Sequence, residues 1–212
     1  MQPNVRSAHL PEPRVFQYSL DWRFLLPIAD PARIHVAFEE AADFSETLER
    51  IGIPVSNQLS DSNLRVNERD NVHSFVLPFG LPIRWVSAQP ADQIEFYRSI
   101  RHFICPGGYF LLGFRNSWSS HSATGYHAAT PDRVVAQLKQ AGFHSIKMFG
   151  AMPNLSIPEY IFELSTQALY FTLQHRFRRK PVLLNMLQVL ARTIGLARLS
   201  NFFPCYFAVA TA

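Results

Sequence analysis

The sequence predicts an α/β domain with a mostly parallel sheet that is covered on both faces. Apolar runs of strand length alternate with helical segments, which is typical of parallel strands joined by crossover helices. Residues 33–55 show this most clearly, with a predicted strand at Ile34–Ala37, a helix over about Phe44–Ile51 that stops at Gly52, and a second strand from Val55. With 212 residues, 48% of them apolar, the chain can bury the core of one sizeable domain.

The segments on either side of this unit fit the same plan. Residues 1–15 are polar and contain proline, so we expect a loose leader, and Tyr18–Ile28 has the apolar spacing of an amphipathic helix. After Val55 the run Ser56–Asn71 is polar, and Ser74–Pro78 predicts a short buried strand.

The second half of the chain alternates in the same way. Gln93–Ile104 has helical spacing, and Cys105–Gly108 (CPGG) predicts a stop and a turn before a central strand at Tyr109–Phe114. A polar loop follows, and Thr130 is the expected N-cap of a helix that stops at Gly142. The last predicted elements are a strand at Phe143–Phe149, a helical segment over 158–198 that breaks near Lys180, and a closing strand at Phe202–Ala210.

Composition and charge narrow the function classes. The net charge of +4 mildly favours anionic partners, but no stripe of Lys and Arg interleaved with aromatics favours nucleic acid. Cys105 and Cys205 lack CxxC spacing, which indicates buried reduced thiols in a cytoplasmic protein, and the eight His form no HxxxH or HExxH pattern, so we expect no metal site. With no signal-peptide stretch and no run of about 18 apolar residues, we expect neither secretion nor a transmembrane segment.

The segment Phe96–Asn116 (FYRSIRHFICPGGYFLLGFRN) resembles the second half of class I S-adenosylmethionine (SAM) dependent methyltransferases, in which a helix runs into a PGG turn and then into a core strand ending in a polar residue. Three flanking segments are similar to the same family, namely the helix before the first strand, the end of a later helix and the final strand, at Trp22–Pro27, Gln140–Phe143 and Asn201–Ala210. His121, the Met152–Pro153 step and the helical insert are similar to a branch tied to surface-glycan and natural-product tailoring.

The resemblance covers most of residues 18–212 and implies one domain over residues 1–212. The implied fold is a three-layer, mostly parallel Rossmann-like sheet of the class I methyltransferase type, with a helical insert at 158–198 before the last strand. The resemblance also implies SAM as the cofactor and methyl transfer as the activity.

The residues at the implied cofactor site depart from the family pattern. The loop after the first strand should carry G-x-G-x-G, but the aligned residues are Phe38, Glu40 and Ala42. The second strand should end in an acid that bridges the ribose hydroxyls, but the aligned residue is Leu59, and the nearest acid, Asp61, comes two residues later.

A third departure is the length of the next connection. The stretch from Leu59 to the strand candidate near His73 is only 14 residues, while a parallel crossover alone needs about a dozen residues or more. We therefore expect a reduced second- and third-strand side of the sheet. Two carboxylates in the first loop would also repel the carboxylate of SAM. The sequence predicts a degenerate SAM site and no cofactor, with a divergent but active SAM-dependent methyltransferase as the alternative; the site positions are Phe38, Glu39, Glu40, Leu59 and Asp61.

The chain that follows the predicted strands Ser74–Pro78 and Tyr109–Phe114 supplies the candidate catalytic and substrate-binding residues. His121, Tyr126 and His127 lie within seven residues of one polar loop. Two imidazoles and a phenol suit general acid–base chemistry near neutral pH, although surface residues that cap one another are the alternative. The candidate substrate-binding residues at the same strand ends are Arg84, Arg115 and Asn116.

Two charged groups have open interpretations. Glu39 and Glu40 could act as a general base or bind a cation in the vacated SAM site, or they could form an acidic helix start. His175–Lys180 (HRFRRK) could dock an anionic carrier, a substrate or membrane headgroups, or it could be a solvated helix end.

We therefore predict a methyltransferase-like biosynthetic protein of natural-product or glycan tailoring that has lost SAM-dependent methyl transfer. It would act on a small molecule, or on a carrier- or peptide-bound substrate, as a SAM-independent acid–base enzyme, or it would support a partner enzyme. The insert, with Tyr160, Phe162, Tyr170, Phe171 and residues 183–190, has more apolar surface than one sheet face needs. We expect a homodimer through it, or a partner subunit.

Overall fold

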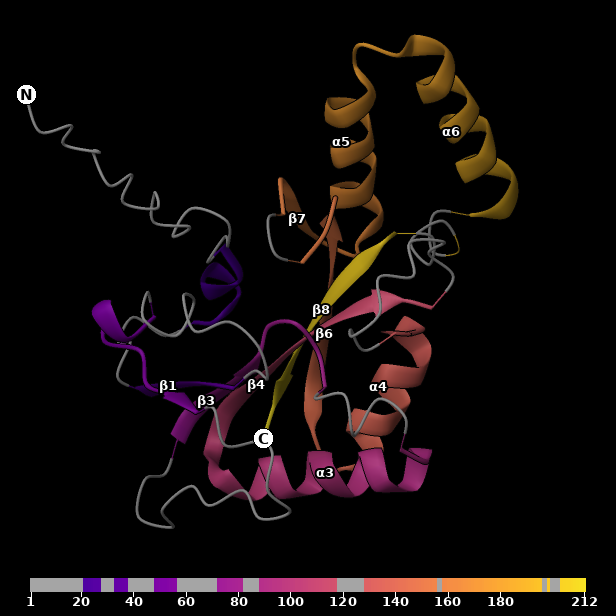
Figure 1. Cartoon of the computed structure of the whole chain (residues 1–212). Helices are drawn as coiled ribbons and strands as arrows, with labels where there is room; N and C mark the ends of the chain where they lie inside the picture. Colours follow the sequence, from indigo (N-terminus) through magenta and orange to yellow (C-terminus); the bar gives the residue numbers. More distant parts are fainter. Residues whose placement is uncertain are drawn as a thin grey trace, which may run out of the picture.

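The structure, a computed structural model, describes residues 21–27, 33–37, 48–56, 72–81, 88–117, 128–155, 158–195, 198 and 203–212 (Figure 1). Its helical elements are η2 (a 3-10 helix, Asp21–Leu25), α3 (Pro90–Phe103), α4 (Pro131–Gln140), α5 (Thr166–Phe177) and α6 (Pro181–Ile194). Its strands are β1 (Ile34–Ala37), β2 (Val55–Ser56), β3 (Val72–Leu77), β4 (Ile104–Asn116), β5 (Ala128–Ala129), β6 (His144–Met152), β7 (Tyr160–Glu163) and β8 (Cys205–Thr211).

Within the described residues the strands form one eight-stranded sheet in the order β2-β1-β3-β4-β8-β6-β7, with β5 paired to the end of β4. Neighbouring strands from β2 to β4 pair in parallel, as do β4 and β5. Strand β8 is antiparallel to both β4 and β6, and β7 is antiparallel to β6. Six strands therefore run one way and two the other, which confirms the predicted mostly parallel α/β sheet.

Apolar side chains cover both faces of this sheet. On one face, Phe110 and Leu112 of β4 pack with Tyr97 of α3, Leu138 of α4 and Leu169 of α5. Successive residues of a strand point to opposite faces of the sheet. Leu111, between Phe110 and Leu112, therefore points to the second face. On that second face Leu111 joins a cluster that includes Trp22 of η2, Leu48 and Ile53 before β2, and Phe207 of β8. The sheet is thus the middle of three layers.

Several predicted elements are confirmed. The first strand has the predicted bounds, and α4 begins where expected, with the Thr130 hydroxyl oxygen accepting a hydrogen bond from the backbone N–H of Arg133 at 3.4 Å. The helical insert breaks at Lys180, since α5 ends at Phe177 and α6 begins at Pro181. Of the predicted helix Tyr18–Ile28, the described part contains the 3-10 helix η2.

Two predictions about secondary structure are wrong. Residues 160–163 form strand β7, antiparallel to β6, and not the start of a helix. Their aromatic and β-branched side chains suit a strand, and a short apolar run does not separate the two states by periodicity. The helix stops before Cys105–Gly108 as predicted, but this segment is part of β4, where the pairing with β3 shifts register, and not a turn before the strand. At Gly108 a Cβ would meet the backbone carbonyl oxygen of His73, so the missing side chain lets β4 approach β3 closely.

On the second-strand side, β2 has two residues and is the last strand of the described sheet. The stretch 57–71, where a third strand would have to lie, is outside the described residues. The predicted reduction of this side therefore stays a prediction.

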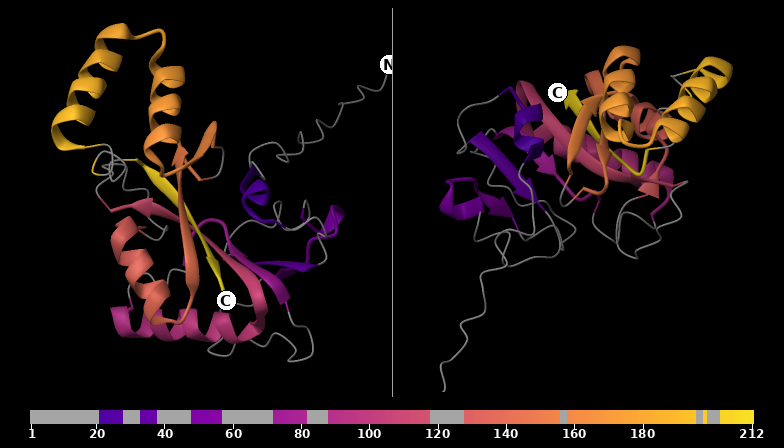
Figure 2. Two further views of the ribbon diagram at one scale, coloured as in Figure 1. Left: turned by 180° about the vertical axis from the view of Figure 1, so that it is seen from behind. Right: turned by 90° about the horizontal axis from the view of Figure 1, so that it is seen from above.

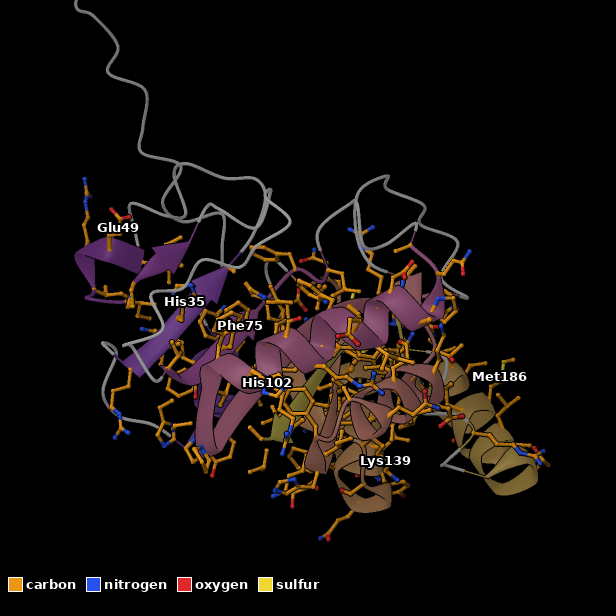
Figure 3. All side chains as sticks on the ribbon, turned by 90° about the horizontal axis from the view of Figure 1, so that it is seen from below. His35, Glu49, Phe75, His102, Lys139 and Met186 are labelled. Atoms are coloured by element: carbon orange, nitrogen blue, oxygen red, sulfur yellow. The ribbon has the colours of Figure 1, made fainter. Side chains whose placement is uncertain are left out.

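His35 on β1 is a titratable group in the sheet interior. Its ring stacks on Phe75 of β3, with 5.3 Å between ring centroids and 25° between planes (Figure 3). Its Nε2 has no hydrogen-bond partner in the described part of the structure, and burial lowers the pKa of His35 below 6.5. Protonation of this imidazole is thus disfavoured in the folded state.

This lowered pKa predicts a loss of stability in acid. Below pH 6.5, the ordinary pKa of His35, the unfolded chain binds a proton that the folded chain does not, so stability falls by up to about 1.4 kcal/mol per pH unit until the folded pKa is reached. His35→Phe keeps a ring against Phe75 and removes the proton. Urea unfolding at neutral and mildly acid pH should show a smaller acid loss for the variant. An identical loss in both proteins would contradict this account.

Candidate functional site

The candidate site lies at the carboxyl edge of the parallel strands, where open α/β sheets bind ligands. Strand β1 ends there at Ala37, β3 at Leu77 and β4 at Asn116. The antiparallel β8 begins at the same edge, since Arg115 of β4 lies opposite Cys205. Residues far apart in the sequence therefore meet at this edge.

The loop that carries the predicted acid–base residues has both of its ends at this edge. Strand β5 pairs with the end of β4, with Arg115 opposite Ala128 and Asn116 opposite Ala129. The backbone N–H of Ser117 also donates a hydrogen bond to the carbonyl of Ala129 at 3.2 Å. The chain thus leaves the end of β4 and returns beside it. The candidates His121, Tyr126 and His127 fall between these two points, outside the described residues.

Asn116 joins the end of β4 to the start of β8. It is 3% exposed, and its side-chain nitrogen donates hydrogen bonds to the carbonyl of Phe203 at 2.9 Å and to the hydroxyl of Tyr206 at 3.3 Å. Its backbone N–H donates to the carbonyl of Pro204 at 2.9 Å. The amide of this predicted substrate-binding residue is thus engaged within the fold, where it fixes the base of the loop.

Tyr206 and Cys205, beside Asn116, are held in their neutral forms by burial. Burial raises the pKa of Tyr206, whose ring stacks on Phe114 at 5.4 Å between centroids. Burial also raises the pKa of the Cys205 thiol to about 11, although the nearby Arg115 guanidinium lowers it. Because the thiolate is the nucleophilic form, Cys205 is inert at neutral pH. Both cysteines are free; Cys205 is buried as predicted, while Cys105 is only partly buried.

The other predicted site residues follow the described strand ends in the sequence and are themselves outside the described residues. The strand β1 ends at Ala37, one residue before Phe38, and β2 ends at Ser56, three residues before Leu59. The remaining candidates, which like Phe38 and Leu59 fall outside the described residues, are Glu39, Glu40, Asp61 and Arg84. In the part of the chain that is described, no group of three or more His, Cys, Asp or Glu could hold a metal ion.

Sequence reasoning missed a polar cluster between the first turn of α3 and the first two turns of α4. The side-chain nitrogen of Gln137 donates to the side-chain oxygen of Gln93 at 2.8 Å, and the Arg133 guanidinium donates to the same oxygen at 3.4 Å. Burial raises the pKa of the neighbouring Tyr97, while the Arg133 charge lowers it. The amides join the two helices. The sequence does show that Arg133 and Gln137, four residues apart, share one face of α4. It does not show that their partner is Gln93, because Gln93 lies 44 residues before Gln137.

Comparisons with known proteins give matches at the level of structure. No family model matches the sequence, and no curated protein matches it. A SAM-dependent methyltransferase of Thermotoga maritima, described as a possible histamine N-methyltransferase, matches with a TM-score of 0.50 at 10% identity, over 89% of this chain and 84% of its own. A SAM-dependent methyltransferase of Mesorhizobium loti matches with a TM-score of 0.47 at 11% identity, over 91% of this chain and 97% of its own. At such identities the likeness concerns the fold alone.

Proposed function

We propose that this chain, which has a class I methyltransferase-like fold, does not use SAM and serves a tailoring pathway as a SAM-independent enzyme or as a partner subunit. One observation carries the proposal. Strand β1 ends at Ala37, and the first glycine after it in the sequence is Gly52, beyond the whole loop that would hold SAM. In nucleotide-binding α/β units, glycines in that loop let the backbone approach the ligand.

Charge and spacing support the same conclusion. Glu39 and Glu40 follow the end of β1 by two and three residues, so they would repel the carboxylate of SAM in a partly dry site. After β2 ends at Ser56, the first acid in the sequence is Asp61, five residues later. An acid that bridges ribose hydroxyls should instead lie at the strand end.

In the enzyme form of this proposal, the loop between Ser117 and Ala128 supplies acid–base chemistry. His121, Tyr126 and His127 would transfer protons, while Arg84 and Arg115 would bind an anionic group of a small, carrier-bound or peptide-bound substrate. The pairing of both ends of this loop beside Asn116, at the carboxyl edge, supports this role. In the partner form, the same edge would contact another enzyme of the pathway.

A divergent, active SAM-dependent methyltransferase is the second candidate. The likeness to the Thermotoga protein, which is described as SAM-dependent, favours it. In that case SAM would be held by side chains and backbone other than a glycine loop.

Thermal unfolding with and without ligand separates these two functions. A ligand at about 100 times its Kd stabilises a protein by about 2.7 kcal/mol, which is roughly 5–10 °C in Tm for a chain of this size. We expect no shift of Tm with millimolar SAM or S-adenosylhomocysteine. A functional methyltransferase in the same buffer serves as the control. A shift of several degrees for this chain would support the second candidate.

A further inference from the structure

Helices α5 and α6 expose a group of large apolar side chains at one end of the molecule. Of the nine exposed large apolar residues in the described structure, seven lie on these two helices. Figures 1 and 2 show the hairpin of α5 and α6 projecting beyond the sheet, at the opposite end from α3. The seven residues are Tyr170, Phe171, Val182, Leu183, Met186, Val189 and Leu190.

On α6 these residues form one stripe, which we call the outer stripe: Val182, Leu183, Met186, Val189 and Leu190. Their spacing of three and four residues places them on one face of a helix. Val182 is 74% exposed and Met186 61% exposed. On the inner side of the same helix Leu184 is only partly exposed and Leu187 packs against the main core. A helix that is apolar on both its inner and outer sides is normally buried on both, so we expect something outside this chain to cover the outer side of α6.

The part of the chain that contains the outer stripe carries only positive charge. Residues 164–212 contain six of the chain's 20 Lys and Arg and none of its 16 Asp and Glu, so this part carries +6 while the residues before it carry −2. Four of these cations cluster where α5 turns into α6, and we call them the tip cations: Arg176, Arg178, Arg179 and Lys180. All four are exposed. In the described residues no ion pair involves them.

We propose that the hairpin of α5 and α6 binds the surface of an anionic lipid bilayer. The outer stripe would lie in the boundary between headgroups and acyl chains, and the tip cations would pair with lipid phosphates and carboxylates. An anionic bilayer offers apolar and negative groups side by side, which matches both features. Among the described helices, none is long and apolar enough to cross a membrane.

A second copy of this chain fits the hairpin less well. A homodimer through the outer stripe would cover the apolar residues, as the sequence analysis expects. It would leave the tip cations without acidic partners, since neither hairpin contains an acidic residue, and with the two α6 helices parallel it would bring both sets of tip cations together. Like charges at close range are unfavourable, and the cost is greatest at low salt.

Vesicle co-sedimentation of the full chain tests the proposal. The probes are vesicles of phosphatidylcholine alone and of phosphatidylcholine with phosphatidylserine, at physiological ionic strength. We expect binding only to the anionic vesicles, and a loss of at least roughly tenfold in affinity for R178Q/R179Q/K180Q, since each cation near such a surface contributes about fivefold. V182S/M186S/V189S should also bind weakly, because it removes the inserted apolar groups. Circular dichroism checks that both variants fold.

The matched control removes the same charge elsewhere. R33Q/K139Q/K147Q changes three exposed cations outside the hairpin, one of them Lys139 on α4 (Figure 3). It should bind within about threefold of the parent chain because long-range charge is screened. The proposal is overturned if the parent chain ignores anionic vesicles, or if the control loses as much as the tip variant. A mass near twice 24.2 kDa that M186S reduces to the monomer would also overturn it, in favour of the homodimer.

Discussion

Gly113→Ala should destabilise the protein by at least about 3 kcal/mol, the upper end for overpacking a core. Gly113 is buried in β4, where a Cβ would meet the backbone carbonyl oxygen of Pro78 and would lie 3.1 Å from the ring of Phe207. The Pro78 backbone cannot withdraw freely, because Leu77 just before it pairs with Leu112 of β4. The clash therefore has to move β3, whose end forms part of the candidate site.

Gly52→Ala is the control for this substitution. A Cβ on Gly52 has nothing within 4 Å, but its φ of +79° disfavours any other residue, so we expect a cost of only about 1 kcal/mol. Urea unfolding followed by circular dichroism measures both variants. If Gly113→Ala lowers the free energy of unfolding no more than Gly52→Ala does, the result would contradict the close packing of β3 against β4.

Asn116→Leu should cost about 2–4 kcal/mol, the second largest effect that we expect. The leucine is similar in size but leaves the carbonyl of Phe203 and the hydroxyl of Tyr206 without the donor that Asn116 provides. A buried polar group without its partner costs about 1–3 kcal/mol. Because Asn116 fixes the base of the loop between Ser117 and Ala128, any ligand of that loop should also bind more weakly.

Tyr206→Phe is the matched control, since it removes one of the two acceptors and keeps the bond from Asn116 to the carbonyl of Phe203. We expect a loss of about 1–2 kcal/mol, because the hydroxyl loses its hydrogen bonds with Asn116 and with the Phe203 backbone. Chemical unfolding of the parent chain and of both variants measures the two losses of stability. If Asn116→Leu costs no more stability than Tyr206→Phe, the hydrogen bond from Asn116 to the carbonyl of Phe203 does not stabilise the fold.

Local signals in the sequence predicted the elements that depend on local chemistry. Thr130 and the following proline placed the start of α4, Pro181 placed the start of α6, and the apolar run Ile34–Ala37 gave β1 its bounds. Each of these signals lies within a few residues of the feature that it predicts. Strand β7 was mistaken for helix because four apolar-rich residues do not carry a distinguishable period.

The strand ends that border the candidate site could be predicted from the sequence, but the hydrogen bonds between them could not. The ends of the parallel strands fixed Arg115 and Asn116 at the carboxyl edge, as predicted. The partners of Asn116 lie 87 and 90 residues later, and Gln93 meets Gln137 across 44 residues. No local pattern specifies such pairs, because they depend on how β8 and α4 pack once the sheet has formed.

Isothermal titration calorimetry with SAM and S-adenosylhomocysteine tests the central claim most directly. The segment that follows β1 has no glycine before Gly52, and Glu39 and Glu40 come two and three residues after the end of the strand. We therefore expect no binding with a Kd below about 50 μM, or roughly −6 kcal/mol, for either ligand. A Kd below that value for SAM or S-adenosylhomocysteine would contradict the claim and identify the chain as a SAM-binding protein.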